Sequence, residues 1–317
     1  MFALRSRAAA ILTAAIADAA IGDPRRGHPV ALFGTAAGWL ERVTYRDSRW
    51  AGALHTSILL LALGLAGALT QRAVARPVVT AVATWAALGG TSLTRTGLEM
   101  AALLERRDVA AARRRLPSLC GRDPGVLGAD GLTRAAVESV AENTSDAQLA
   151  PLLWAAVGGV PAVLIYRGLN TLDAMIGHRS PRYARFGWAT ARLDDLANLM
   201  PARVTAALVV VCAPLVGGSP AGAVSAWRRD AARHPSPNAG VVEAAFAGAL
   251  RRRLGGPTQY AYGLQIRPTL GDGDLPGVAD LRRAVRLSQA VQVAALAITL
   301  AALSVGGRIG RRVSPRR

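Results

Sequence analysis

The sequence predicts an all-α, polytopic integral membrane protein with about five transmembrane or re-entrant helices and long polar helical connections. The 317-residue chain is 51% hydrophobic and 18% charged, with a mean hydropathy of +0.27. A soluble domain of this size has about 25% charged residues. The uncharged residues gather in long intervals, and clusters of arginine stand at the edges of these intervals. Together, these observations favour a chain that crosses a membrane several times.

Five intervals without a charged residue are long enough to cross a bilayer. They contain 22, 18, 20, 24 and 21 residues and lie between Arg49 and Arg72, Arg76 and Arg95, Asp146 and Arg167, Arg203 and Arg228, and Arg286 and Arg308. At about 1.5 Å per residue, each approaches the roughly 30 Å of a bilayer core. Helices of a soluble protein rarely lack a charged stripe over this length. The Gly158-Gly159-Val160-Pro161 break also permits a re-entrant pair of half-helices over 147–166.

The charged residues are strongly basic, with 38 Lys and Arg against 20 Asp and Glu. All 38 are arginine, so a P-loop lysine and a Schiff-base lysine are both excluded. Arginine at the edges of apolar spans agrees with the positive-inside rule. Single-stranded nucleic-acid binding requires aromatic side chains for stacking, and these are only 5% of the chain, so we expect no nucleic-acid partner. Cys120 and Cys212 support neither a disulfide framework nor a zinc site.

We expect residues 1–317 to form a single membrane-embedded domain. The polar segments that can carry a site are about 22–49, 95–146, 167–203 and 228–286.

The most informative polar segment is 121–154, where Arg134, Glu138, Glu142 and Asp146 follow one another at i, i+4 spacing. On a helix they form a single stripe. Stacked carboxylates repel one another and are stable opposite cations or a divalent metal, so this stripe predicts a metal or substrate face, with Asn143 beside it. The alternative is a solvated helix face.

Two further helical segments carry polar pairs. Asn170 and Asp173 are i, i+3 neighbours directly after an apolar span, and can share a ligand or cap a helix at a membrane exit. Asp194 and Asn198 share a helix face.

Two proline-rich loops each carry one histidine. The first holds Asp23 and His28, and the second holds His234 and Asn238. A histidine in a loop is often a surface residue, but two such loops beside acidic helices favour a function.

Five blocks of this sequence resemble the successive signature blocks of the adenosylcobinamide-phosphate synthase family, the integral-membrane enzymes of late cobalamin biosynthesis. The blocks are GDPRRGHPV (22–30), GRDP (121–124) with RAAVESVAENTSDAQLAPLLW (134–154), YRGLNTLDAMIGHR (166–179), ARLDDLANLMPARVTA (191–206) and HPSPNAGVVEAAFAGALRRRLGG (234–256). The resemblance covers about residues 15–275, in the same order, and is specific.

The resemblance implies a multi-pass protein of the cell membrane that joins aminopropanol or aminopropanol phosphate to the propionate carboxylate of adenosylcobyric acid. It also implies ATP hydrolysis and a requirement for Mg²⁺. Within this reaction we expect Glu138, Glu142 and Asp146 to hold Mg²⁺. We expect catalytic roles for His28, Asp173, Asp194 and His234. We expect the substrates and ATP to be bound by Asp23, Arg122, Arg134, Asn143, Asn170, Asn198 and Asn238.

Two other interpretations remain. A transporter or cation-binding membrane protein without chemistry would use the same carboxylates to bind a cation, although polar connections longer than the spans argue against it. A scaffold that docks other enzymes of the pathway at the membrane is compatible with the sequence as a second role.

Overall fold

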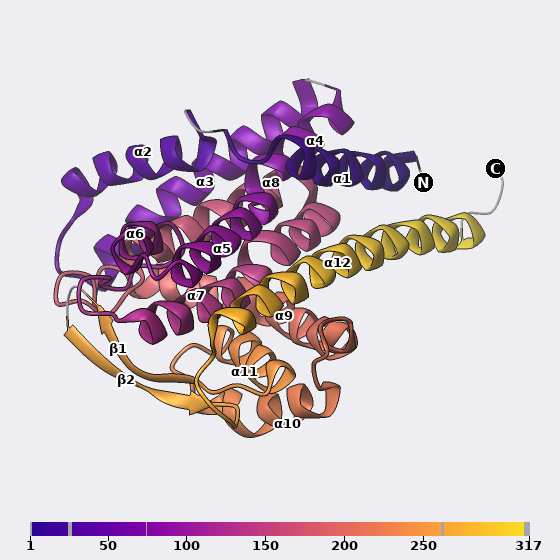
Figure 1. Cartoon of the computed structure of the whole chain (residues 1–317). Coiled ribbons are helices and arrows are strands. Elements are labelled where there is room, and N and C mark those ends of the chain that lie inside the picture. Colours follow the sequence, from indigo (N-terminus) through magenta and orange to yellow (C-terminus); the bar gives the residue numbers. More distant parts are fainter. Residues whose placement is uncertain (1, 25–26, 74, 261–262, 314–317) are drawn as a thin grey trace. The chain divides into compact units, whose positions relative to one another are not determined.

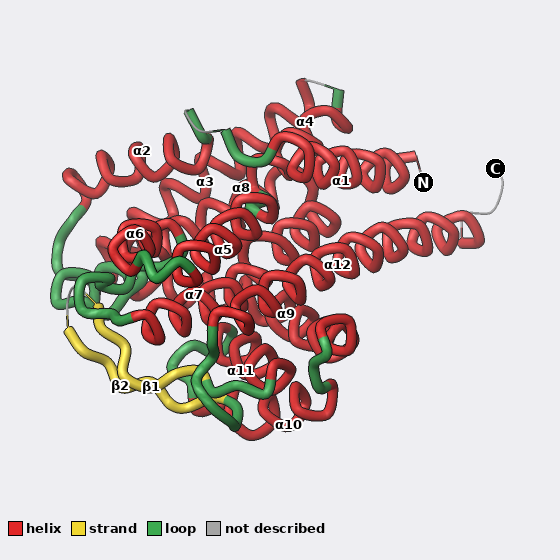
Figure 2. Tube along the Cα trace, viewed as in Figure 1, coloured by secondary structure: helices red, strands yellow, loops and turns green. Residues whose placement is uncertain are grey.

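The computed structural model describes residues 2–24, 27–73, 75–260 and 263–313. Helices make up 77% of the chain, and the strands within the described ranges form one two-stranded sheet (Figures 1 and 2). The prediction of an all-α polytopic protein is confirmed, with a small hairpin that the sequence did not indicate.

The main helices are α1 (Phe2–Ile21), α2 (Pro29–Thr44), α3 (Arg49–Ala73), α4 (Arg76–Ala87), α5 (Gly90–Glu105), α6 (Val109–Arg115), α7 (Ala129–Thr144), α8 (Ala150–Ile176), α9 (Trp188–Cys212), α10 (Pro220–Asp230), α11 (Ala239–Leu250) and α12 (Val278–Val313). A π-helix, Ser145–Leu149, joins α7 to α8. Short 3₁₀ turns occur at Leu116–Ser118, Ala213–Val216 and Ala231–Arg233. The hairpin consists of β1 (Leu254–Tyr260) and β2 (Gly263–Leu270).

Four helices in the described ranges are long and apolar enough to cross a membrane. They are Arg49–Ala73, the composite Ala129–Ile176, Trp188–Val216 and Val278–Gly306. The expected number was about five, and the difference lies in the interval between Arg76 and Arg95. This interval is divided between α4 and α5 because the backbone becomes extended at Leu88, before the Gly89-Gly90 pair. The 12 residues of α4 extend only about 18 Å.

The chain forms two compact units, each assembled from separate stretches of sequence. Unit 1 draws on Met1–Gly89, Leu149–Ala197 and Ala295–Arg317, whereas unit 2 draws on Gly90–Gln148 and Asn198–Ala294. Helices α9 and α12 therefore contribute residues to both units.

In unit 1, helix α8 is kinked at Gly159, whose φ of 65° is left-handed. This is the glycine break expected from the sequence, and Pro161 follows it. The backbone groups released by the kink have side-chain partners. The Val160 N–H donates to Gln71 Oε1 at 3.1 Å, and Arg7 Nη1 donates to two carbonyls of the preceding turn. A broken helix of this kind is tolerated in an apolar environment because its polar groups are satisfied within the protein. The re-entrant path stays a prediction.

Helix α11 is the central helix of unit 2, and all 12 of its residues are buried. It lies beside α10, where Gly222 and Gly248 bring the two backbones together (Figure 1). A Cβ on Gly248 would stand 2.1 Å from the Gly222 carbonyl oxygen, so only glycine permits this approach. Because α11 is enclosed, any charged side chain on it must be accommodated inside the protein.

The β1–β2 hairpin is antiparallel, with a bulge at Gly255. A Cβ on Gly255 would lie 2.0 Å from the Pro268 carbonyl oxygen, and its φ is 80°, so the bulge requires glycine. At the same open end of the hairpin, the buried Asp230 carboxylate accepts from the Gly271 N–H at 2.8 Å and from Arg229. This contact fastens the end of β2 to the end of α10.

Candidate functional site

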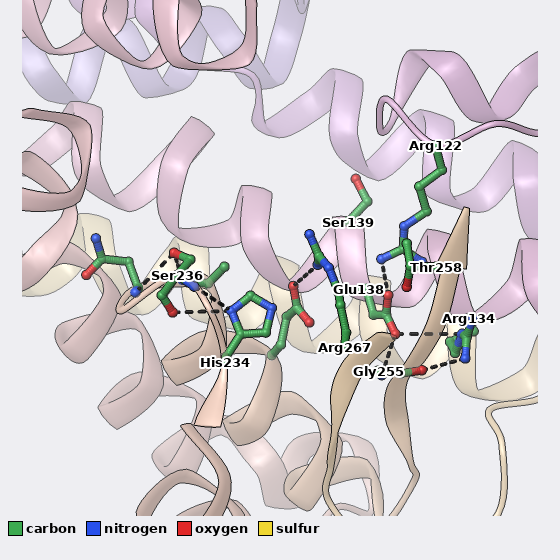
Figure 3. A network of polar contacts seen from close by, with 12 residues as sticks. Arg122, Arg134, Glu138, Ser139, His234, Ser236, Gly255, Thr258 and Arg267 are labelled. Atoms are coloured by element: carbon green, nitrogen blue, oxygen red, sulfur yellow. Dashed lines mark hydrogen bonds and ion pairs between the residues drawn. The ribbon is translucent and has the colours of Figure 1, made fainter. Parts of the chain in front are cut away.

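A buried network of charged side chains lies within unit 2, where α7, α11, the hairpin and two loops meet (Figure 3). Its members are Arg122, Arg134, Glu138, Glu142, His234, Glu243 and Arg267. Five of these, Arg122, Arg134, Glu138, Glu142 and His234, were predicted site residues, and His234 comes from a segment far along the chain from the other four.

Glu138 is the centre of one half of the network and is only 1% exposed. Its Oε2 accepts from Arg122 Nη2, and its Oε1 accepts from the Gly255 N–H at 2.7 Å. Arg134 Nε lies 3.9 Å from the same Oε1. Because both oxygens of Glu138 are engaged by donors of the protein itself, this carboxylate does not fit the metal-ligand role expected from the stripe.

Arg134 holds the hairpin. Its two Nη atoms donate to the Gly255 and Pro257 carbonyls of β1. A guanidinium presents five N–H donors in a fixed fork, and here the fork spans two strand carbonyls. The expectation that Arg134 binds phosphate is therefore replaced by a structural role, in which α7 positions β1.

The C-terminal part of the predicted stripe, Glu142 and Asp146, extends from the end of α7 into the π-helix. Asn143 donates its side-chain amide to the Ser139 carbonyl at 2.9 Å, so it bonds within its own helix. Glu142 is half-buried, and Asp146, also half-buried, lies in the first turn of the π-helix. Single π-turns inside helices occur frequently at functional sites.

The second half of the network contains His234, Glu243 and Arg267. Arg267 Nη1 of β2 stands 3.7 Å from Glu243 Oε1 of α11. The His234 ring lies in the loop that leads into α11, and its Nδ1 stands 3.1 Å from the Ser236 nitrogen and 3.2 Å from the Ser236 carbonyl oxygen. Figure 3 shows His234 and Arg267 in the same network as Glu138.

Burial shifts the pKa values of two of these groups. Desolvation, followed by the positive charge of Arg267, lowers the pKa of His234 to about 4, so its imidazole is neutral at pH 7. Desolvation, followed by the negative charge of Glu138, raises the pKa of the Glu243 carboxyl well above its ordinary value, while Arg267 opposes the shift.

The described residues include no group of three or more His, Cys, Asp or Glu side chains that could hold a metal ion by themselves. Mg²⁺ does not require such a group, because proteins commonly hold it through one or two carboxylates and the phosphates of a substrate. Glu142 and Asp146 fit this arrangement, whereas Glu138 does not.

Five predicted site residues belong to unit 1 instead: Asp23, His28, Asn170, Asp173 and Asp194. His28 caps α2, since its Nδ1 accepts from the Val30 N–H at 3.1 Å, and its Nε2 lies 3.4 Å from Asp23 Oδ1. Asn170 Oδ1 accepts from Arg167 at 3.4 Å. Asp173 is half-buried near the end of α8, and Asp194 is buried on α9. His28 therefore acts as a helix cap, a role that the sequence did not indicate for it.

In unit 2, two predicted asparagines lie outside the charged network. Asn238 Oδ1, just before α11, accepts from Arg203 Nη1 at 3.1 Å, and Asn198 is buried on α9.

The sequence interpretation missed Glu243 and Arg267. The sequence did contain a sign of Glu243, because this is the one charged residue in the otherwise uncharged 12-residue segment that forms α11. No comparable sign marked Arg267, because it reaches α11 only through the folding of the β1–β2 hairpin.

Comparison with known proteins assigns the family. The family model described as CobD/Cbib protein matches residues 11–288. "Cobalamin biosynthesis protein CobD" of Mycobacterium tuberculosis (strain CDC 1551 / Oshkosh) is 69% identical over 299 residues, which cover 93% of this chain and 96% of the relative. The protein of the same name from Geobacter metallireducens is 43% identical over 277 residues, 83% of this chain and 86% of the relative. No solved structure matches. Since both the family model and these relatives span most of its length, the chain belongs to the CobD/Cbib family.

Proposed function

We propose that this protein acts in cobalamin biosynthesis as an ATP- and Mg²⁺-dependent carbon–nitrogen ligase of the cell membrane. It joins aminopropanol or aminopropanol phosphate to the propionate carboxylate of adenosylcobyric acid, giving adenosylcobinamide or its phosphate. The relatives named for cobalamin biosynthesis support the pathway. The observation that carries the chemistry is the buried network of carboxylates, guanidiniums and one neutral histidine in unit 2.

The reaction requires two steps. A carboxylate does not react with an amine at neutral pH until one of its oxygens becomes a leaving group. Attack of the carboxylate on the γ-phosphorus of ATP forms an acyl phosphate and releases ADP. The amine nitrogen then attacks the acyl carbon, phosphate leaves with the original carboxylate oxygen, and the nitrogen loses a proton to a base. Phosphoryl transfer of this kind depends mainly on positioning and charge neutralisation.

The side chains of the network suit separate parts of this chemistry. Arg267 has a buried Nε without an acceptor among the described residues, so it can donate to a phosphate or carboxylate oxygen. Arg122, held by Glu138, adds a second fixed positive charge. His234 is neutral at pH 7 and can take the proton of the attacking amine.

Mg²⁺ would be held by Glu142 and Asp146 together with nucleotide phosphates. When bound, it supplies neutralisation of the phosphate charge. Glu138 and Arg134 keep the hairpin in place over α7.

A mass-spectrometric assay tests this proposal. Detergent-purified protein is incubated with adenosylcobyric acid, 1-amino-2-propanol or its phosphate, ATP and Mg²⁺. We expect a mass gain on the corrinoid that equals the amine minus water and disappears when ATP or the amine is omitted. No gain with either amine contradicts the ligase and favours a transporter or a scaffold.

Isotope labelling tests the order of the steps. With ¹⁸O in the corrinoid carboxylate, label in inorganic phosphate with ADP as the other product is expected. Label in AMP would instead indicate an adenylate intermediate and contradict direct phosphorylation.

A further inference from the structure

The carboxylate of Glu243 differs from the other buried acids of unit 2. Both of its oxygens are buried without a hydrogen-bond donor among the described residues, and the Arg267 Nη1 at 3.7 Å lies beyond hydrogen-bond distance. Glu138, Asp230 and Asp280 each accept from at least one backbone N–H and one arginine. A buried acceptor without a donor costs free energy, so Glu243 is an exception that calls for a reason.

His234 presents a third buried atom of the same kind. Its ring lies near Glu243, because His234 packs against Gly240, which is one helical turn before Glu243 on α11. Its Nε2 has no hydrogen-bond partner in the described part of the chain. Its Nδ1 lies 3.1 Å from the Ser236 nitrogen and 3.2 Å from the Ser236 carbonyl oxygen, so either ring tautomer is held. When Nδ1 carries the proton, Nε2 becomes an acceptor.

The position of the His234 ring depends on a glycine of α11. A Cβ on Gly240, in the first turn of α11, would stand 2.4 Å from the His234 Cβ, so glycine is needed for the loop to lie this close to the helix.

The charges around these atoms favour a cation. Glu138 is already neutralised by Arg122 and approached by Arg134. Arg267 pairs with Glu243. The positive charge of Arg122 acts on Glu243 more weakly than the negative charges of Glu138 and Glu142 do. Burial and the two neighbouring carboxylates outweigh the two arginines and raise the pKa of Glu243, so a cation beside this carboxyl group is favoured.

We propose that Glu243 and His234 bind the ammonium group of the primary amine substrate, with Arg267 as the fixed counter-ion that orients the Glu243 carboxylate. A primary ammonium has three N–H donors, which match the two Glu243 oxygens and His234 Nε2. Glu243 is then a substrate-binding residue. This inference rests on the proposed ligase for the identity of the amine, but the ammonium site itself does not require turnover.

The test compares Glu243→Gln with the control Glu99→Gln, an exposed acid of the same unit that pairs with Arg115. The amide keeps the size of the side chain and cannot ionise, whereas burial penalises the ionised form of Glu243, so the melting temperature of Glu243→Gln is expected to stay unchanged or rise. The KM for 1-amino-2-propanol is expected to rise at least about tenfold, with the KM for ATP within about twofold of wild type. Glu99→Gln should match wild type in all three quantities.

Two results would overturn the inference: an unchanged amine KM in Glu243→Gln, or a changed Mg²⁺ requirement in place of a changed amine KM. If Glu243→Gln fails to fold, His234→Gln must show the same selective rise in amine KM.

A binding experiment separates this inference from the proposed function. Calorimetric titration of 1-amino-2-propanol into the full-length protein without ATP or corrinoid is expected to show saturable binding that Glu243→Gln weakens at least about tenfold. The uncharged 1,2-propanediol should not bind. If wild type binds the amine in this way but forms no amide, the ligase fails and the ammonium site stands. If wild type forms the amide while Glu243→Gln keeps wild-type amine binding and KM, the ligase stands and the ammonium site fails.

Discussion

The kink in α8 and the charged network around α11 both place polar groups in apolar surroundings, but their hydrogen bonding differs. At the kink, Gln71 accepts from the Val160 N–H, and Arg7 donates to the carbonyls of the turn before Gly159. In the network, Glu243, His234 and Arg267 keep buried atoms that no described residue satisfies. A complete set of partners is sufficient for a structural role, whereas the unpartnered atoms of Glu243 and His234 call for a reason, which the proposed ammonium ligand supplies.

The same contrast divides the network itself. The half around Glu138 is closer to the kink: each Glu138 oxygen has a donor and Arg134 joins α7 to β1, although Arg134 Nε lacks a hydrogen-bond partner among the described residues. The half around Glu243 is open to further hydrogen bonds. We therefore expect substitutions around Glu138 to act mainly on stability, and substitutions around Glu243 and Glu142 to act mainly on activity.

The largest effect is expected from Glu138→Ala. It leaves the buried Arg122 without its counter-ion and the Gly255 N–H without its acceptor, at a cost of about 3–5 kcal/mol. Thermal unfolding in detergent measures the loss. The control Glu99→Ala breaks an exposed ion pair and should cost less than about 1 kcal/mol. Equal stability of the two variants would remove the distinction between the halves of the network.

The pH dependence of stability is expected to reveal His234. Its folded-state pKa is about 4 against 6.5 in the unfolded chain, so between these values the unfolded state binds more protons. The free energy of unfolding therefore falls as the pH falls from 6.5 to 4, by up to about 3 kcal/mol from this group. Melting curves of wild type and His234→Gln at pH 7, 6 and 5 measure it. The variant should lose less stability than wild type, and parallel curves contradict the expectation.

Gln71→Leu tests the structural side of the comparison. It leaves the Val160 N–H without an acceptor and is expected to cost about 1–3 kcal/mol, with amide formation within about twofold of wild type. Thr70→Val on the same helix removes a hydroxyl that bonds only to carbonyls of its own turn, and serves as the control. Lost activity at unchanged stability would show that the kink is more than structural.

The smallest change in free energy is expected from Glu142→Gln. Its half-buried carboxylate should hold Mg²⁺, so turnover is expected to fall at least about tenfold, which corresponds to about 1.4 kcal/mol in the barrier. The melting temperature should be nearly unchanged. Partial rescue at raised Mg²⁺ assigns the residue to the metal. Glu105→Gln, an exposed acid paired with Arg282, should keep wild-type turnover, and an equally active Glu142→Gln returns the stripe to a solvated face.

The local patterns of the sequence were sufficient for the helical class, the glycine break in α8 and the i, i+4 pairing of Arg134 with Glu138. These features depend on residues close together in the chain, and helix geometry alone brings such residues onto one face. The division of the apolar interval at Leu88 was not recognised, since a long interval without charge does not show where its backbone turns.

The tertiary structure decided which polar residues meet. Arg122 and Glu138 are neighbours in sequence terms, but Glu243 and Arg267 reach the same network from a helix and a strand more than 100 residues further along the chain. It also decided the role of each charge. Arg134 and Glu138 have local patterns typical of ligand binding, yet the hairpin occupies them, while Glu243 on an apolar helix keeps its oxygens available. The sequence alone determined which charged groups exist and which of them lie on one helix face. Whether each group has a hydrogen-bond partner depends on packing between segments far apart in the chain, which the local pattern of residues does not show.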